Sequence, residues 1–372
     1  MAFIFTTQDK QQLKEKGISE EQVVEQLSYF REGYPALQIK CPATIGKGII
    51  KLDDFKQQKY LLKWKDYLKS DKQVVKFVPA SGAASRMFKD LFAFLEGESK
   101  KPLTDVEKKF FDNIHSFAFH DELDNLCIHI YNRSIDELLS EEEYKDIVDV
   151  LLSEKGLNYG NLPKGLLLFH NYSDTKRTPM EEHLVEGAIY AKGKNKKVNV
   201  HFTISSNHKA LFERLLNNKK EALEKLNDAF FDVSFSVQKP STDTIAVDLN
   251  NRPFRDNDTL LFRPGGHGAL IENLNDLDAD IIFIKNIDTV VPDKYKESDV
   301  YHKKVLAGIL VDVQDKVFSY IDKLESENYT QEHLEEIEAF LTNELCISNF
   351  ITLENTKDDR VNSLLEKLNR PI

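Results

Sequence analysis

Cysteine is scarce in this sequence: Cys41, Cys127 and Cys346 are the three among 372 residues. Their odd number and wide spacing exclude a disulfide framework and match no zinc motif. No run of about 18 uncharged apolar residues occurs, which excludes a spanning helix and a membrane partner. The opening MAFIFTTQDK turns polar too early for a secretory signal. We therefore expect a cytoplasmic protein.

Positive charge is also in deficit. Lys and Arg number 50 against 62 Asp and Glu, which gives a formal net charge of −12. Affinity for DNA or RNA rests on neutralised phosphates, so the charge argues against a nucleic-acid partner. A small anion remains compatible with it, provided that a few cationic side chains converge and a divalent cation assists.

Changes in apolar period divide the chain into three regions. Residues 1–70 are predicted to be a helical region with a loop near 36–52, 71–297 an α/β domain, and 298–372 a helical C-terminal region. The last residues follow a helix pattern and could begin another strand. This leaves open the alternative that the chain is a fragment of a longer protein.

Strand and helix patterns alternate in the middle region. The alternation is typical of an α/β fold with a mostly parallel sheet flanked by helices, and 244–247 with 259–262 suggest an antiparallel ribbon. Between about 100 and 160 the pattern is helical throughout, which we interpret as an insertion. The predicted strands are short apolar runs: 74–78, 165–170, 198–205, 231–237 and 281–284.

Capping boxes mark several helix starts. A Ser or Thr is followed three residues later by Gln or Glu at Ser19, Thr104 and Ser140. Thr178 could cap a further helix with Pro179 at its first position. Lys176 and Arg177 precede that helix and could touch a sugar phosphate.

The loop after the 74–78 strand suits an anion. It reads Ser81-Gly82-Ala83-Ala84-Ser85-Arg86. Small side chains let backbone N–H groups approach a phosphate, the following helix offers its positive end, and Arg86 could fork onto phosphate oxygens. The alternative is a tight strand-to-helix turn with Arg86 in solvent, since the loop fits neither the Rossmann fingerprint nor a Walker loop.

Three later segments carry further candidates. Lys164 at a strand entry could project its charge into the crevice outside the carboxyl ends of the strands, or lie in solvent. His267 lies among Gly265, Gly266 and Gly268, whose backbone could face a flat ring. Asp288 follows the 281–284 strand and could hold magnesium or form a turn. His170 and His183 suggest a metal, but adjacent Glu182 and His183 point to different helix faces, so no ligand set is expected.

In their order, these segments resemble the nucleotide-sugar pyrophosphorylases, in particular the uridylyltransferase branch. The family's Gly-Gly-x-Gly-Thr-Arg loop corresponds to 81–86, with Ser81 and Ala84 in place of two glycines. Its later segments Pro-Lys-Gly, Phe-x-x-Gln, Pro-Gly-His-Gly and Asn-x-Asp correspond to 163–165, 235–238, 265–268 and 286–288. The chain also looks like an uncharacterised bacterial family, a domain of unknown function with the same fold.

The resemblance implies a nucleotide-diphospho-sugar transferase fold, Rossmann-like and GT-A-like. It implies transfer of a nucleoside monophosphate, UMP in this branch, from UTP to a sugar 1-phosphate with release of pyrophosphate. Arg86 and Lys164 would hold the phosphates as catalytic cations, and Asp288 would hold Mg²⁺. The nucleotide would contact the loop and the base-reading residues Ser81, Gly82, Ala83, Ala84, Ser85, Gln238, Gly265, Gly266 and His267.

Two other classes of function stay open. Ser81 and Ala84 favour a non-catalytic nucleotide or nucleotide-sugar binding protein of the same fold. The helical insertion and the acidic helical C-terminus are also compatible with an interaction protein that takes no ligand.

Overall fold

The computed structural model describes residues 3–39, 41–347 and 356–369. The chain forms two compact units, 1–36 with 71–297 and 37–70 with 298–372. The first 70 residues are thus divided between the units. The strand suggested at the chain's end falls on 370–372, which lie outside the described residues.

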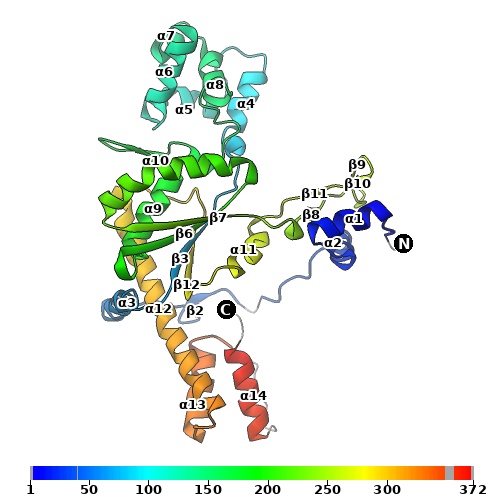
Figure 1. Ribbon diagram of the computed structural model, residues 1–372, viewed down its shortest axis with the longest axis vertical. Coiled ribbons are helices and arrows are strands. Elements are labelled where there is room, and N and C mark those ends of the chain that lie inside the picture. Colours follow the sequence, from blue (N-terminus) through cyan, green and yellow to red (C-terminus); the bar gives the residue numbers. More distant parts are fainter. Residues whose placement is uncertain (1–2, 40, 348–355, 370–372) are drawn as a thin grey trace. The chain divides into compact units, whose positions relative to one another are not determined.

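The first unit contains a four-stranded parallel sheet (Figure 1). Its order is β12-β3-β6-β7, and β3 and β6 pair in register from Val75↔Asn199 to Pro79↔Thr203. Every residue of β3 is buried, as in a strand covered on both faces. The prediction of an α/β fold with a parallel sheet and flanking helices is confirmed. The strands are β3 (Val74–Pro79), β6 (Lys197–Ile204), β7 (Phe230–Val237) and β12 (Ile281–Ile284).

Helices α9 (Pro179–Tyr190) and α10 (Lys209–Asn227) pack against this sheet. Thr178 caps α9 through a capping box and Pro179 occupies its first turn, as predicted. A Cβ at Gly187 would lie 3.0 Å from Val198 Cγ1, so the glycine permits the close approach of α9 to β6. The helix is buried on nearly every side, including its charged residues.

Helix α9 carries Glu186 into the protein interior. Glu186 Oε2 lies 3.0 Å from Lys76 Nζ of β3, and both side chains are fully buried. Glu186 Oε1 also lies 2.8 Å from Lys285 Nζ, just beyond β12. A buried carboxylate needs such partners because its desolvation is costly. Glu186 therefore joins α9 to β3 and to the end of β12.

The segment at 165–170 is not the buried strand that its apolar run predicted. Residues 164–166 form a 3-10 turn, η3 (Lys164–Leu166). Only β4 (His170–Asn171) pairs, antiparallel with β5 (Lys176–Arg177). The apolar run has another cause: Leu167 packs into the core of the helical insertion, and Leu166 packs against the core of the sheet. Burial here reflects contacts to two different cores.

The insertion consists of helices around a hydrophobic core of its own. Thr104 caps α5 through the expected box with Glu107. The box predicted at Ser140 is wrong: Ser140 ends α7, which is capped by Ser134, and α8 begins without a side-chain cap. The α-helices between β3 and β4 are α4 (Lys89–Glu96), α5 (Asp105–Asp112), α6 (His120–Tyr131), α7 (Ile135–Ser140) and α8 (Tyr144–Leu152).

Helices α1 (Thr7–Lys16) and α2 (Glu20–Glu32) pack on the antiparallel ribbon predicted near 244–262. Gly17, with φ +73°, separates them, and Ser19 caps α2 as expected. The Gln12 amide donates to Leu260 O and accepts from Leu260 N, as a neighbouring strand would. The ribbon strands are β8 (Thr244–Ile245), β9 (Arg255–Asp256), β10 (Thr259–Leu260) and β11 (Phe262–Arg263).

The second unit is mainly helical. Trp64 of α3 is buried, and Lys63 Nζ lies 2.9 Å from Asp312 Oδ1 of α12. A separate apolar core joins α12 to α13 and α14. Its elements are β1 (Thr44–Ile45), β2 (Gly48–Ile49), α3 (Asp54–Tyr67), most of α12 (Asp293–Glu325), α13 (Gln331–Asn343) and α14 (Lys357–Leu368).

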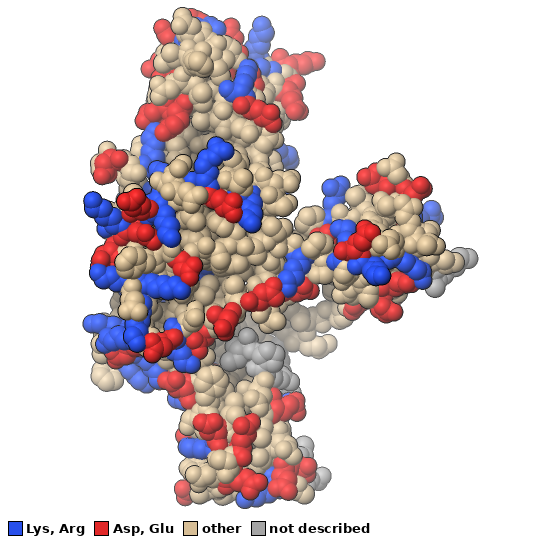
Figure 2. All heavy atoms as spheres, viewed as in Figure 1, with Lys and Arg blue, Asp and Glu red and all other residues tan. Residues whose placement is uncertain are grey.

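Charged side chains of both signs are intermixed on the face drawn in Figure 2, where the described residues form no single extended basic patch. Within the described ranges, no helix combines the length and the apolar character needed to cross a bilayer.

Because Glu186 has two lysine partners, we expect Glu186→Leu and Lys76→Met to lower the free energy of unfolding by different amounts. Glu186→Leu leaves the ammonium groups of Lys76 and Lys285 without this carboxylate, and should lower the free energy of unfolding by about 3–5 kcal/mol. Lys76→Met should cost clearly less, because Glu186 keeps Lys285. Urea unfolding of both variants measures the difference. Equal costs would contradict this account.

Candidate functional site

A cleft of about 780 Å³ lies at the carboxyl edge of the sheet. Parallel strands end at one edge, so the residues that follow β3, β6, β7 and β12 all reach it. β3 has β6 on one side and β12 on the other, and such a reversal of strand order opens a crevice suited to ligands. The lining polar or glycine residues are Lys16, Ser81, Gly82, Arg86, Lys164, Ser205, Ser206, Gln238, Asp243, Gly265, Gly266, His267, Asn286 and Asp288.

The loop after β3 is fixed to the segment that ends the helical insertion. Ala84 N donates to Leu162 O at 3.1 Å, and Lys164 N donates to Gly82 O at 3.1 Å. The two ends of the helical insertion therefore lie side by side, next to the loop after β3. These two hydrogen bonds bring Lys164 beside the loop despite the long separation in sequence.

Lys164 and Asp288 form an ion pair inside the cleft. Lys164 Nζ lies 2.6 Å from Asp288 Oδ2, and about a quarter to a third of each side chain is exposed. The hydrogen bond from Lys164 holds the pKa of Asp288 below its ordinary value. Arg86 is exposed at the cleft wall and has no ion-pair partner among the described residues. The cleft thus offers one paired and one unpaired cation on its β3 side.

Gln238 and the glycine turn also line the cleft. A Cβ on Gly265 would lie 2.9 Å from Ala269 Cβ and 3.0 Å from Thr242 O, so glycine is required there. Gln238 Nε2 is buried and finds no hydrogen-bond partner within the described part of the chain. This buried amide donor is therefore available to an acceptor in the cleft.

Two residues of the predicted phosphate loop do not line the cleft: Ala84 is buried in the core of the insertion, and Ser85 is exposed but is not part of the lining. The helix expected after the loop is present as α4, but it begins at Lys89. A 3-10 turn, η1 (Ala84–Arg86), lies between the loop and this helix. The turn at His267 likewise leads through η7 (His267–Leu270) into the short α11 (Ile271–Asn275). Helix ends therefore contribute less to this cleft than the sequence suggested.

Lys176 and Arg177, the candidate sugar-phosphate contacts, lie outside the cleft lining. Lys176 Nζ is paired with Asp121 Oδ2 at 2.8 Å and with Glu122 Oε2 at 2.7 Å. Arg177 is buried, and its NH1 lies 2.9 Å from Asp293 Oδ1. Both cations are thus engaged by carboxylates of the chain.

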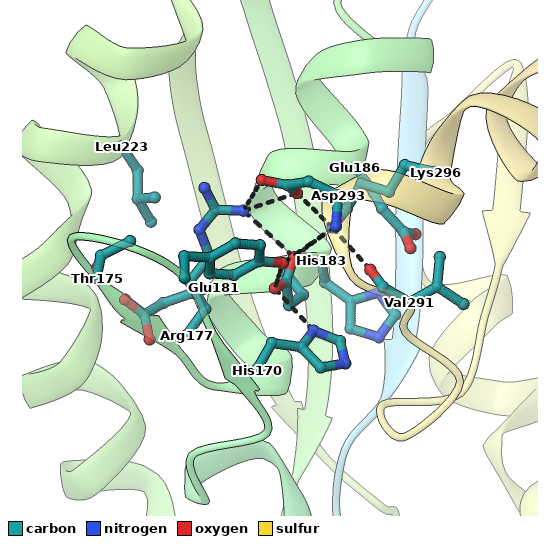
Figure 3. A network of polar contacts seen from close by, with 12 residues as sticks. His170, Thr175, Arg177, Glu181, His183, Glu186, Leu223, Val291, Asp293 and Lys296 are labelled. Carbon is teal, nitrogen blue, oxygen red and sulfur yellow. Dashed lines mark hydrogen bonds and ion pairs between the residues drawn. The ribbon is translucent and has the colours of Figure 1, made fainter. Parts of the chain in front are cut away.

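Arg177 belongs to a polar cluster around the buried Glu182, whose Oε2 lies 3.6 Å from Arg177 NH1. Figure 3 labels its members His170, Arg177, Asp293 and Lys296. Tyr172 Oη donates to Glu182 Oε1 at 2.6 Å, and His170 Nδ1 lies 2.9 Å from the same oxygen. Lys296 Nζ lies 2.5 Å from Glu182 Oε2. Burial alone would raise the pKa of Glu182, but the hydrogen bonds from His170, Lys296 and Tyr172 outweigh it and lower the pKa to about 2. We call these residues, with Arg177 and Asp293, the Glu182 cluster.

Sequence reasoning missed four cleft residues: Lys16, Ser205, Ser206 and Asp243. Lys16 ends α1, and its Nζ lies 2.8 Å from Asp243 Oδ2. No local pattern marks Lys16, because it reaches the cleft only through the packing of α1 on the ribbon. Ser205 and Ser206 follow β6, so their place at a strand end was the one available signal.

A metal would need further ligands beside Asp288. Across the described ranges, no group of three or more His, Cys, Asp or Glu side chains could hold an ion. Mg²⁺, however, is commonly held by one or two carboxylates together with substrate phosphates and water. Asp288 could hold Mg²⁺ in this way together with a phosphate ligand, whereas the described residues form no protein cage for it.

Fold and cleft define an α/β protein with a ligand-sized crevice at the carboxyl edge of a parallel sheet. The chain belongs to the family described as domain of unknown function DUF4301, which it matches over residues 6–372. No curated protein and no solved structure matches it.

The lowered pKa of Glu182 predicts a pH-dependent contribution to stability. The ionised carboxylate stabilises the fold above its ordinary pKa of about 4.5, and this contribution is lost as the pH falls toward 2. Glu182→Gln should therefore cost about 3 kcal/mol at neutral pH and progressively less in acid. Urea unfolding of wild type and variant between about pH 7 and 3.5 measures the gap, and a constant gap would refute the assignment.

Proposed function

We propose that the protein is a GT-A-like nucleotidyltransferase that transfers UMP from UTP to a sugar 1-phosphate and releases pyrophosphate. One observation carries the proposal. Residues far apart in the sequence, among them Arg86, Lys164, Gln238, Gly265 and Asp288, line a single cleft. Their chemistry divides that cleft into a cationic side and a side suited to a flat base.

The cationic side suits phosphoryl chemistry. The attacking oxygen of a sugar 1-phosphate is ionised near neutral pH, so the reaction requires alignment and neutralised charge more than a general base. Arg86 and the exposed backbone of Gly82 and Ala83 face the cleft and would orient the phosphates. This reaction is compatible with a cleft that is lined by cations, amides and the carboxylates of Asp243 and Asp288.

Lys164 and Asp288 would act as a pair that a ligand separates. Lys164 would turn its ammonium to a phosphate oxygen, and Asp288 would then be free to hold Mg²⁺. Bound there, the cation would neutralise charge on the phosphates. Because the two side chains neutralise one another without ligand, a phosphate arriving alone must disrupt their 2.6 Å contact. We therefore expect nucleotide affinity to depend on the divalent cation.

The base would lie against Gln238 and the glycine turn. The unpartnered Gln238 Nε2 can donate to a carbonyl oxygen of the base, and the amide oxygen can accept from its N–H. Gly265 allows the turn to pack closely, since a Cβ there would lie 2.9 Å from Ala269 Cβ and 3.0 Å from Thr242 O. Uracil, which presents both groups on one edge, fits this pair.

Nucleotide binding without turnover is the second candidate, and the loop favours it specifically. Ala84 stands where the resembled family has a glycine, and its N–H is already bonded to Leu162 O. One amide of the loop is thus withdrawn from phosphate binding, and the Ala84 side chain is fully buried. The loop can cradle fewer phosphate oxygens than an all-glycine loop.

Pyrophosphate release tests the catalytic proposal. Full-length protein with UTP, Mg²⁺ and a panel of sugar 1-phosphates should release pyrophosphate for at least one sugar. Omitting the sugar 1-phosphate, and replacing Asp288 by Asn, serve as controls that should abolish the signal. Calorimetric binding of UTP without any release would establish the second candidate instead. Absence of both would refute nucleotide recognition.

Arg86 offers a sharper test of the phosphate side. Arg86→Gln removes a cation of the cleft that has no ion-pair partner among the described residues. It should weaken Mg²⁺–UTP binding by about 10- to 100-fold, as expected for a lost charge-assisted hydrogen bond. Arg214→Gln is the matched control, since Arg214 is exposed on α10 and does not line the cleft. Calorimetry should show the loss for Arg86 alone. Equal affinities of the two variants would place the phosphates elsewhere.

A further inference from the structure

The segment 285–296, which carries Asp288 between β12 and the first turn of α12, is attached to α9 at three points. Glu186 Oε1 lies 2.8 Å from Lys285 Nζ at its start. Glu182 lies 2.5 Å from Lys296 Nζ at its end, and Lys296 also donates to Val291 O at 2.8 Å. Between these points lies His183. Successive polar side chains of one helix thus hold one short segment of chain.

His183 makes the middle contact, next to Asp288. Its Nε2 lies 3.2 Å from Asn286 O and 3.1 Å from Ile287 O. Carbonyl oxygens only accept hydrogen bonds, so Nε2 carries the proton and donates to both. His183 Nδ1 is buried and finds no hydrogen-bond partner in the described residues, so the polar role of this side chain runs through Nε2. Complete burial, together with nearby Lys76 and Lys285, holds the pKa of His183 well below its ordinary value.

The same residues are also fixed to the sheet. Ile287 N donates to Pro79 O at 3.1 Å, and Lys285 N donates to Phe77 O at 3.1 Å. Asn286 and Ile287 therefore lie between β3 and the imidazole of His183. Asp288 follows directly, and its side chain turns toward Lys164 and the cleft.

Ion pairs restrain the same segment a second time, near Asp293. Arg177 NH1 and Lys296 Nζ both lie within 3 Å of Asp293 Oδ1, at 2.9 and 2.8 Å. Both cations also face Glu182, at 3.6 and 2.5 Å. Glu182 and Asp293 thus share two cations. In Figure 3, Lys296 also contacts Val291, so the cluster is linked to the chain that precedes α12. The segment cannot shift without separating buried charges from their partners.

We infer that His183 and the Glu182 cluster are positioning elements that hold the Asn286–Asp293 segment so that the Asp288 carboxylate faces the cleft. The inference rests on the proposed function for its consequence, a correctly placed metal and phosphate contact, but the restraint itself exists without ligand. Partners that orient a metal-holding side chain commonly change affinity by about 10- to 100-fold when they are removed.

Two variants of His183 separate positioning from bulk packing. His183→Leu keeps an apolar side chain of similar size and removes the donor. His183→Gln returns an amide N–H near the place of Nε2. In the apo protein, His183→Leu should speed hydrogen exchange of the 286–292 amides, including that of Ile287, by about tenfold or more. Exchange in β7 should stay unchanged. His183→Gln should restore most of the protection of 286–292.

Ligand binding provides the second readout. The affinity for UTP measured with Mg²⁺ should fall by about tenfold in His183→Leu, recover in His183→Gln, and differ little between variants without the cation. If His183→Leu does not fold, Asp293→Asn, at a half-exposed side chain, should give the same local exchange and the same loss.

The outcomes distinguish the two ideas. Unchanged exchange in 286–292, or faster exchange throughout the sheet, would overturn the positioning role. Local loosening with unchanged Mg²⁺–UTP affinity would overturn its link to the cleft. If wild-type protein binds no UTP at all, the proposed function fails, and the exchange comparison still decides whether α9 holds the segment.

Discussion

Burial of charge on α9 is the constraint on which the first unit depends. Glu182, His183 and Glu186 are all fully buried, and a carboxylate without partners would be strongly destabilising there. Their partners come from β3, from the hairpin β4–β5 and from the chain around the start of α12. These ion pairs and hydrogen bonds therefore fix the positions of these segments relative to α9, which nondirectional hydrophobic contacts alone would not do. The same ties define the edge of the sheet at which the cleft opens.

The parts of the fold that sequence predicted are those with local causes. Each strand of the parallel sheet is an apolar run long enough to be recognised, and the caps at Ser19, Thr104 and Thr178 follow from short-range hydrogen bonds. The run at 165–170 misled because its leucines pack on two different cores without pairing in a sheet. An apolar run indicates that a segment is buried. Whether the segment also forms a strand depends on whether its backbone pairs with a neighbouring strand.

The candidate site was predictable to the extent that it follows strand ends. Gln238 and Asp288 lie just beyond β7 and β12, and parallel strands bring such residues together. Lys16 was not predictable, because it depends on α1 docking against a ribbon more than 200 residues later in the chain. Lys176 and Arg177 were placed in the wrong surroundings for a similar reason: their carboxylate partners come from α6 and α12, which no local pattern joins to them.

The charges of the cleft explain how a protein with a net charge of −12 could receive an anion. Two of its three cations, Lys16 and Lys164, are paired with Asp243 and Asp288, and only Arg86 has no such partner among the described residues. Under the proposed function, an incoming phosphate would gain Arg86 directly but would have to disrupt a pair to gain a lysine. A divalent cation would lower that cost, since it could take the carboxylate that the lysine leaves. Metal dependence would then follow from the pairing of charges on the cleft wall, even though the described residues build no metal cage.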